Sequence, residues 1–454
     1  MRRLMLTPRL QIAMETTRKL LRMKAMGKVS KVIEKLHPAD IAHILEYLSE
    51  GEEKAVLNLI KDPAVAAEVL SELEWGTAAS ILQSMETGKI ISILQNMPPD
   101  DAVEIISNVP EELAEKLLEG MKKDELEDLL SYPEETAGRI MNPVYFALHE
   151  DTTVGEAIKA VRQAADAEMV FYVYVLDERN HLVGVVSLRQ LLLTNPDALV
   201  RTIMNTEVFS VTTHEDQEEV ARVVEKYNIL AVPVVDDENK LVGVITVDDV
   251  IDILRDEATE DFLKMAGTRE EEYLYTSNSM KVTRLRIPWL LTNLAGGLVT
   301  GYLLWLFKVT IKDVLALVTF IPVITAMGGN AGLQSSTIMV RGLATGRTGY
   351  VKLSMIVLKE FRVGMIMGVV CGAVVGIVGL LWHGDPMLGV VVCVAMIIGM
   401  TMACTMGALI PSLFSKIHVD PAIATGPFVT TANDITGILI YLGTATLFLK
   451  HFVY

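Results

Sequence analysis

The 454-residue sequence predicts a multidomain membrane protein with an all-α superhelical N-terminal domain, a tandem α/β repeat and an α-helical membrane domain of five transmembrane helices. The first observation behind this prediction is the distribution of charge. Residues 1–286 carry a net charge of −21, whereas residues 287–454 carry +4 and contain only 14 charged side chains. The second is a pair of similar segments 59 residues apart, and the third is a series of long apolar runs in the C-terminal part. The chain therefore joins an acidic aqueous part to a membrane part.

Residues 20–135 have the apolar periodicity of short helices. Ile41, Ile44, Leu45 and Leu48, for example, follow one another at helical spacing. Pro-Asp pairs or glycines interrupt the pattern at short intervals, and the Asp, Thr and Ser residues there can cap the next helix. We expect a small superhelix of short helices.

An internal repeat follows this helical region. Residues 171–192 align without gaps to residues 230–251, and eight of the 22 positions are identical. Each copy predicts a strand, a polar turn, a second strand and then a helix, and a helix-forming stretch precedes each copy at 154–165 and 217–227. Tandem copies of this kind bury their sheets against each other and leave clefts between them. The identical positions include Asp177 and Asp236, Asn180 and Asn239, and Gly184 and Gly243.

Residues 251–266 predict one amphipathic, acidic helix between the repeat and the membrane. Asp249 and Asp252 are three residues apart, Glu257 and Glu260 are also three apart, and Asp256 precedes Glu260 by four. These spacings place carboxylates on shared helix faces, where like charges repel each other. A bound divalent cation would relieve the repulsion. Solvated surface charge explains the pattern equally well, and the sequence leaves both explanations open.

Five apolar runs of at least 20 residues predict membrane spans. At about 1.5 Å per residue, each is long enough to cross a hydrocarbon core of about 30 Å. Five such runs in succession are very improbable for buried helices of a soluble protein. The runs are Ile287–Phe307, Val314–Leu333, Val363–Trp382, Met387–Phe414 and Ala422–Leu449.

The positions of Lys and Arg predict the orientation. Nine of them flank the runs on one side, and only Lys308, Lys312 and Lys450 flank the other side. Positive charge gathers on the cytoplasmic side of membrane proteins. We therefore expect a multi-pass protein of the inner or plasma membrane, with a cytoplasmic N-terminal half and the C-terminus outside. The first residues have no apolar core long enough for a signal peptide. The nine are Lys281, Arg284, Arg286, Arg341, Arg347, Lys352, Lys359, Arg362 and Lys416.

The third run contains a stripe of glycines at every fourth position. Such a helix face has no side chains, and a neighbouring helix can pack against it backbone to backbone. We interpret the stripe as a packing surface. It consists of Gly364, Gly368, Gly372 and Gly376.

The fifth run contains one charged residue, Asp434, near Thr430, Thr431 and Asn433. A carboxylate in the bilayer interior costs about 2.5–3.5 kcal/mol on insertion scales. No Lys or Arg lies within any of the five runs to pair with it. We therefore interpret Asp434 as lining an aqueous path for a cation. A protonated, hydrogen-bonded structural residue is the alternative.

The end of the second run is rich in glycine and contains Gly328-Gly329-Asn330. Glycines at this density favour a broken or opened helix, which at membrane depth is tolerated in protein-buried or water-lined places. Exposed carbonyl oxygens there would suit a hard cation. An ordinary interfacial turn is an equally good reading of the same residues.

The repeat resembles a tandem cystathionine-β-synthase-type (CBS) pair over residues 138–255. In such modules a Ser/Thr-x-x-Asp sequence at the start of the helix after the second strand binds the ribose of a nucleotide. Thr246 and Asp249 fit this pattern, whereas the first copy has Ser187 and Gln190 at these places. The resemblance therefore implies that ATP is a candidate ligand at the second copy.

As a whole, the chain resembles the MgtE family of magnesium channels. The resemblance rests on residues 322–336, which contain Gly328-Gly329-Asn330, and on residues 420–437, which contain Asp434, both following a CBS pair. It implies a helical cytosolic N-domain (1–137), a CBS pair (138–255), a connecting or plug helix (256–283) and a transmembrane pore domain (284–454).

The resemblance also implies a homodimer in the lipid bilayer, whose second and fifth membrane helices line the pore. Asp434 would hold hydrated Mg²⁺ through its water molecules, beside Gly328, Gly329 and Asn330. Cytosolic Mg²⁺ would also bridge acidic residues of the N-domain, the CBS pair and the connecting helix, and so hold a closed state. One acid of the family falls at Asn228, which is neutral and weakens one such site. The implied regulatory ligands are Asp216, Glu218, Asp249, Asp252, Glu257, Glu260 and Asp261, with Asp100, Asp101 and Glu104 in the N-domain.

The predicted function is a Mg²⁺-selective channel for magnesium uptake, not an enzyme, with Mg²⁺ as both substrate and regulatory ligand. The alternative is a CBS-regulated secondary transporter of another divalent cation or a small solute. A nucleotide-driven pump would need a Gly-x4-Gly-Lys-Ser/Thr loop, and the sequence has none. The acidic charge argues against nucleic acid as a partner. The three cysteines form neither a disulfide framework nor a zinc spacing.

Overall fold

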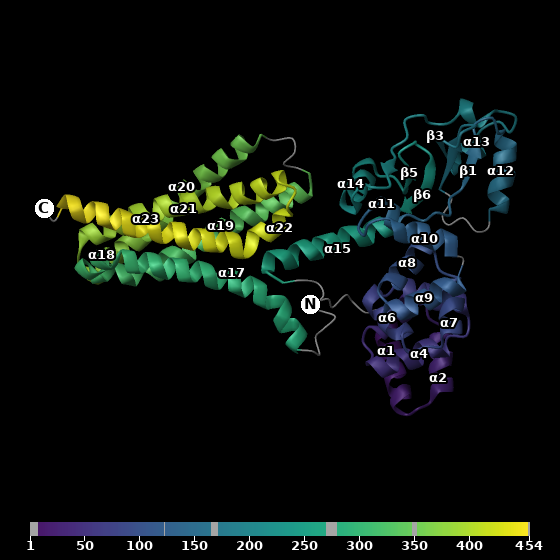
Figure 1. The fold of residues 1–454 in the computed structure, drawn as a ribbon, viewed down its shortest axis with the longest axis horizontal. Coiled ribbons are helices and arrows are strands. Elements are labelled where there is room, and N and C mark those ends of the chain that lie inside the picture. Colours follow the sequence, from purple (N-terminus) through teal and green to yellow (C-terminus); the bar gives the residue numbers. More distant parts are fainter. Residues whose placement is uncertain (1–7, 122, 165–170, 269–278, 347–351, 453–454) are drawn as a thin grey trace. The chain divides into compact units, whose positions relative to one another are not determined.

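The computed structural model describes residues 8–121, 123–164, 171–268, 279–346 and 352–452 (Figure 1). It divides into two compact units, Met1–Leu254 and Arg255–Tyr454. The boundary falls inside the helix α15 (Val247–Ala266). The two units are described separately below.

The N-terminal part of the first unit is a superhelix of short helices, as predicted. Even-numbered helices pack on the next even-numbered helix from α2 to α10, and odd-numbered helices do the same from α3 to α9. Local caps set the helix starts: Asp62 accepts a hydrogen bond from Ala64 N at 3.1 Å, and Ser49 forms a capping box with Glu52. The helices are α1 (Pro8–Arg22), α2 (Met26–Ile33), α3 (Pro38–Leu45), α4 (Glu50–Leu59), α5 (Pro63–Ser71), α6 (Trp75–Leu82), α7 (Thr87–Leu94), α8 (Pro99–Ser107), α9 (Glu111–Gly120) and α10 (Lys123–Ser131).

The rest of the first unit consists of two three-stranded sheets with the same topology. In each sheet the first strand is parallel to the second, and the second is antiparallel to the third. Both sheets have a register shift at the end of the second strand. The predicted strand–turn–strand–helix repeat is confirmed, and the sequence analysis missed β1 and β4. The elements are α11 (Ala137–Ile140), β1 (Ala147–His149), α12 (Val154–Gln163), β2 (Tyr172–Leu176), β3 (Leu182–Ser187) and α13 (Leu188–Leu193), then β4 (Val211–Thr212), α14 (Gln217–Tyr227), β5 (Ala231–Val235), β6 (Leu241–Thr246) and α15.

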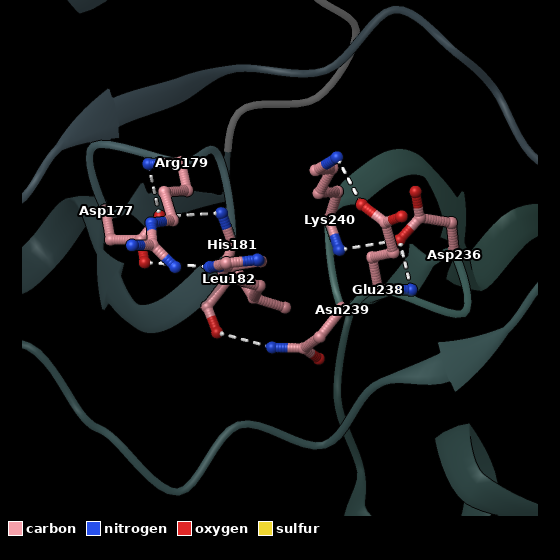
Figure 2. Close-up of polar contacts among 8 residues, drawn as sticks. All are labelled: Asp177, Arg179, His181, Leu182, Asp236, Glu238, Asn239 and Lys240. Atoms are coloured by element: carbon pink, nitrogen blue, oxygen red, sulfur yellow. Dashed lines mark hydrogen bonds and ion pairs between the residues drawn. The ribbon is translucent and has the colours of Figure 1, made fainter.

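The turns of the two copies explain why Asp and Asn recur in both. Asp177 Oδ1 and Asp236 Oδ1 each accept hydrogen bonds from two backbone N–H groups of their own turns, at 2.8–2.9 Å (Figure 2). Asn180 and Asn239 have φ angles of 65° and 62°, a left-handed conformation that Asn tolerates well. The copies also meet here, because Asn239 Nδ2 donates to Leu182 O at 3.3 Å (Figure 2).

The second unit is a bundle of long helices. Four stretches of helix, at 279–306, 315–344, 353–383 and 386–416, are long and apolar enough to cross a membrane. The last helix, α23, has 24 residues and is not among these four helices of the described ranges, so the count of five spans stays a prediction. The elements are α17 (Ser279–Leu306), α18 (Lys308–Asp313), η2 (Leu315–Phe320), α19 (Ile321–Ala344), α20 (Leu353–His383), α21 (Pro386–Lys416), α22 (Pro421–Ile423), the π-helical turn η3 (Ala424–Phe428) and α23 (Val429–Phe452).

The glycine stripe of α20 is a packing surface against α21. A Cβ atom added at Gly364, Gly372 or Gly376 would lie 2.8 Å from a backbone oxygen of α21, and one at Gly368 would lie 2.7 Å from Ile397 Cα. These distances are shorter than van der Waals contact, so the two backbones approach this closely only because the side chains are missing. The structural interpretation of the stripe is therefore supported.

Candidate functional site

Asp434 lies near the start of α23, just after the π-helical turn η3. Its side chain is half-buried, and among the described residues it has no hydrogen-bond partner. The neighbouring Asn433 is 2% exposed and contacts α19, since a Cβ built on Gly332 would be 1.8 Å from Asn433 Nδ2. Gly332 thus lets α19 and α23 approach each other closely beside Asp434.

The expectation that glycines open the second membrane helix is wrong. α19 is one continuous helix from Ile321 to Ala344, and Gly328, Gly329 and Asn330 lie inside it, so neither a break nor an interfacial turn occurs there. In lipid, intrahelical hydrogen bonds satisfy the backbone, which favours helix despite the glycines. Added Cβ atoms at Gly328 and Gly329 would meet no atom within 4 Å, and Asn330 is exposed. Gly329 and Asn330 are therefore at least partly open to solvent or lipid, whereas Gly328 is buried, and none of the three breaks the helix.

The end of α15 contacts the residues that precede α23. Lys264 Nζ lies 2.6 Å from Glu260 Oε1 and 2.7 Å from Asp420 Oδ2. Burial lowers the pKa of the Lys264 ammonium, but its hydrogen bonds to Asp420 and Glu260 outweigh this effect and raise the pKa above its usual range. A Cβ on Gly426 would lie 2.6 Å from Met265 O. The connecting helix therefore lies against the segment that leads into α23 with both polar and backbone contacts.

Two acidic residues at the start of α14 have structural partners. Asp216 is the N-cap, and its Oδ1 accepts a hydrogen bond from Glu218 N at 2.8 Å. Glu218 accepts a hydrogen bond from Arg222 at 2.7 Å. Burial raises the pKa of the Glu218 carboxyl, although Arg222 opposes this effect. The carboxylates of Asp216 and Glu218 therefore each have a hydrogen-bond partner within this unit, and their role as cation ligands stays a prediction.

Asp249 lies in the first turn of α15, next to the candidate nucleotide cleft of the second repeat. Its Oδ2 accepts hydrogen bonds from Thr246 N at 3.1 Å and from Thr246 Oγ1 at 2.7 Å. Burial raises the pKa of this carboxyl, and the charges of Asp248 and Asp252 raise it further. The Thr-x-x-Asp pair is thus preformed at the junction of β6 and α15.

The other acids of α15 follow along the helix. Asp252 is exposed, and Glu257, Glu260 and Asp261 are half-buried. Glu260 forms the ion pair with Lys264 described above.

The acids of the N-domain lie on α8. Asp100 is 7% exposed, and Asp101 and Glu104 are partly exposed. Glu104 forms an ion pair with Arg139, whose guanidinium also donates a hydrogen bond to Leu129 O. Burial raises the pKa of Glu104, and the charge of Arg139 opposes the increase. Glu104 therefore already has a cationic partner within this unit.

The described ranges contain no group of three or more His, Cys, Asp or Glu side chains arranged to hold a metal ion. The predicted regulatory ligands occur singly or as pairs. Three charged residues outside the predicted site have well-defined contacts: Lys264 and Asp420, which pair with each other, and Glu360, which accepts a hydrogen bond from Ser335. Lys264 and Asp420 are far apart in the chain, so no local pattern pairs them. Extending the glycine stripe one step towards the N-terminus would have found Glu360.

Together, these features define a class: a membrane protein of long packed helices with one acidic residue in its last helix, preceded in the chain by a tandem repeat of two similar α/β units. Comparison with known families identifies it further. Residues 321–444 match a family described as a divalent cation transporter, residues 36–135 match the MgtE intracellular N domain, and residues 137–194 and 200–256 match CBS domains. The chain belongs to the MgtE family.

Individual relatives agree with this assignment. The magnesium transporter MgtE of Thermus thermophilus is 38% identical, with 92% of this chain and 95% of the relative covered. The magnesium transporter MgtE of Enterococcus faecalis is 40% identical over 72% of each chain. Among solved structures, the cytosolic domain of the Mg²⁺ channel MgtE in complex with ATP is 36% identical, has a TM-score of 0.50, and covers 53% of this chain and 99% of its own.

Proposed function

We propose that this chain is a Mg²⁺ channel for magnesium uptake through the inner or plasma membrane, and not an enzyme. The observation that carries the proposal is the half-buried carboxylate of Asp434, which has no partner among the described residues, on a helix that packs against α19, where added Cβ atoms on Gly328 and Gly329 meet no atom and Asn330 is exposed. Such a site offers a negative field and space for water. A hydrated Mg²⁺ ion suits it, because this ion loses its water reluctantly.

The size of the expected effect follows from Coulomb's law. A divalent ion held through one water layer, about 5.5 Å from the carboxylate, gains about 1.5 kcal/mol from that single charge even at the dielectric constant of bulk water. This corresponds to about a tenfold change in the occupancy of the site. A drier path would make the effect larger.

Regulation belongs to the same proposal. Cytosolic Mg²⁺ binds carboxylates of the N-domain, the CBS pair and the connecting helix and favours a closed state, by binding it more tightly than the open one. The adjacent pair Asp216 and Glu218 and the raised pKa of Asp249 support this, since a cation would relieve the charge held at these places. The remaining proposed ligands are Asp252, Glu257, Glu260 and Asp261, with Asp100, Asp101 and Glu104 in the N-domain.

The assembly and ligands follow in the same way. Only 6% of the most apolar stretch of α17 is buried within one chain. This exposure supports a homodimer in which lipid and a second copy of the chain cover the helix. The nine flanking cations support a cytoplasmic N-terminal half and an external C-terminus. The preformed pair of Thr246 and Asp249, together with the ATP-bound relative, supports ATP binding at the second repeat.

The test is Mg²⁺ flux into liposomes containing the purified full-length chain. Asp434→Asn, which removes the charge and keeps the shape, should lower flux about tenfold or more by the argument above. Asp385→Asn is the matched control, because Asp385 is the N-cap of α21 and Asn caps as well as Asp. Equal flux in Asp434→Asn and wild type would refute the pore. Mg²⁺ on the cytoplasmic side should suppress flux in the wild type, and unchanged flux would refute the gating.

A further inference from the structure

A carboxylate is buried in the membrane unit at the end of the glycine stripe. Glu360 precedes Gly364 by four residues, so it continues the stripe of α20 one step further, on the same helix face. Its side chain is 7% exposed. The face that packs without side chains along α21 thus ends in a single acid.

Glu360 bonds to the helix that we propose lines the cation path. Ser335 Oγ, on α19, donates a hydrogen bond to Glu360 Oε2 at 2.7 Å, and Ser335 is itself 5% exposed. α21 closes the junction, since an added Cβ on Gly407 would lie 2.4 Å from Gly332 O and 3.0 Å from Ser335 Cβ. Three helices therefore meet at one polar contact.

The chemistry of this contact is unusual for a purely structural bond. An ionisable residue buried among membrane helices is costly and is a functional candidate by default. Among the described residues, no Lys, Arg or His forms an ion pair with Glu360, and Ser335 is its hydrogen-bond partner.

The hydrogen bond between Ser335 and Glu360 also adds a directional interaction to the packing of α19. At Gly332 and Gly407 the backbones of α19 and α21 meet without side chains, so this point of the packing gives no directional resistance to rotation or sliding of α19, although other side chains of the two helices pack together. A directional hydrogen bond one turn further along α19 can fix both. Ser335 is five residues, about 7.5 Å along the helix, from Asn330.

We propose that Glu360 is a positioning residue for cation passage: by accepting the hydrogen bond of Ser335, it fixes the rotation of α19 and thereby the direction in which Gly328, Gly329 and Asn330 face. This inference rests on the proposed function, because it requires that α19 lines the path.

The test compares Ser335→Ala, Glu360→Met and Glu360→Gln in full-length protein in liposomes. The readouts are the Mg²⁺ concentration at half-maximal flux, the ratio of Mg²⁺ to Ca²⁺ flux, and the thermal unfolding midpoint. Ser335→Ala and Glu360→Met should each shift the half-maximal concentration or the flux ratio about fivefold or more, as expected for a lost hydrogen bond to a charged group. Glu360→Gln keeps an acceptor and should restore wild-type values, and the double variant Ser335→Ala/Glu360→Met should be no worse than either single variant.

Ser412→Ala is the matched control, because Ser412 is also 5% exposed and its hydroxyl bonds within its own helix, to Ala408 O at 2.7 Å. If Ser335→Ala folds and conducts with wild-type affinity and flux ratio, like Ser412→Ala, the positioning role is overturned. A Glu360→Gln variant as impaired as Glu360→Met would overturn it too. Asp434→Asn, measured in parallel, separates the two proposals: normal flux in that variant would refute the pore itself.

Discussion

The contact between α20 and α21 allows a quantitative prediction for Gly368→Ala. The new Cβ would lie 2.7 Å from Ile397 Cα, and the next atoms, at 3.0 and 3.3 Å, also belong to the backbone of Ile397. No side chain can rotate away to make room. Ordinary contact begins at 3.4 Å, so the helices must separate locally by about 0.7 Å, which costs about 1–3 kcal/mol as in other overpacked cores.

The control is Gly399→Ala on α21, where an added Cβ meets no atom within 4 Å. Both substitutions gain the same helix propensity, up to about 1 kcal/mol, so their difference isolates the steric term. A difference of 1–3 kcal/mol corresponds to about a 5- to 150-fold change in the unfolding equilibrium constant.

The assay can use the cysteines of the bundle. Cys404 is 1% exposed, whereas Cys371 and Cys393 are only half-buried and can be replaced by alanine in all variants. Maleimide labelling of Cys404 during titration with sodium dodecyl sulfate then reports the opening of this interface. Gly368→Ala should label at a lower detergent fraction than Gly399→Ala. Coincident curves for the two variants would refute the view that missing side chains set the distance between these helices.

Two further predictions concern the soluble unit. Arg139→Met should destabilise α8 and its neighbours by about 2–4 kcal/mol, because it leaves the carboxylate of Glu104 without its cationic partner and removes the hydrogen bond that Arg139 donates to Leu129 O. Hydrogen exchange of α8 in the full chain would measure this. Arg201, whose ion pair with Asp151 is exposed, supplies the control Arg201→Met, and equal protection of α8 in the two variants would contradict the prediction. Asp249 has a folded-state pKa above its unfolded value, so its ionisation costs stability as the pH rises through the folded pKa. Asp249→Asn should therefore stabilise the Mg²⁺-free protein at pH 7, and Mg²⁺ protection of α15 in the wild type should weaken as the pH falls through that raised pKa. A variant with the same stability and pH response as the wild type would contradict this expectation.

The parts of the fold that can be predicted from the sequence are those with enough consecutive residues to show a periodic pattern of apolar side chains. The repeat gave β2, β3, β5 and β6 with their turns, because strand alternation and the Asp and Asn turn residues occur twice. β1 and β4 have three and two residues, too few for any period, and tertiary pairing alone makes them strands.

The candidate site was less predictable, because its geometry depends on neighbouring helices. Glycine density around residue 329 suggested an opened helix, but in lipid the backbone has no water to replace its internal hydrogen bonds. The third span was also placed to begin after the charges near residue 360, whereas α20 begins at Leu353 and includes Glu360 in its buried face. Because charged residues were excluded from the predicted spans, the role of Glu360, whose carboxylate connects α20 to α19, was not recognised from the sequence.

The unbroken course of α19 also limits how any ion that passes it is recognised. Carbonyl oxygens inside a regular helix are engaged with amide groups four residues further on and point along the axis. These carbonyl oxygens therefore cannot form the rings of inward-facing oxygens with which some selectivity filters replace the hydration shell of an ion. Discrimination along α19 would then depend on the diameter and charge density of the aquated ion and on the side chains that face it, and not on a cage of backbone oxygens.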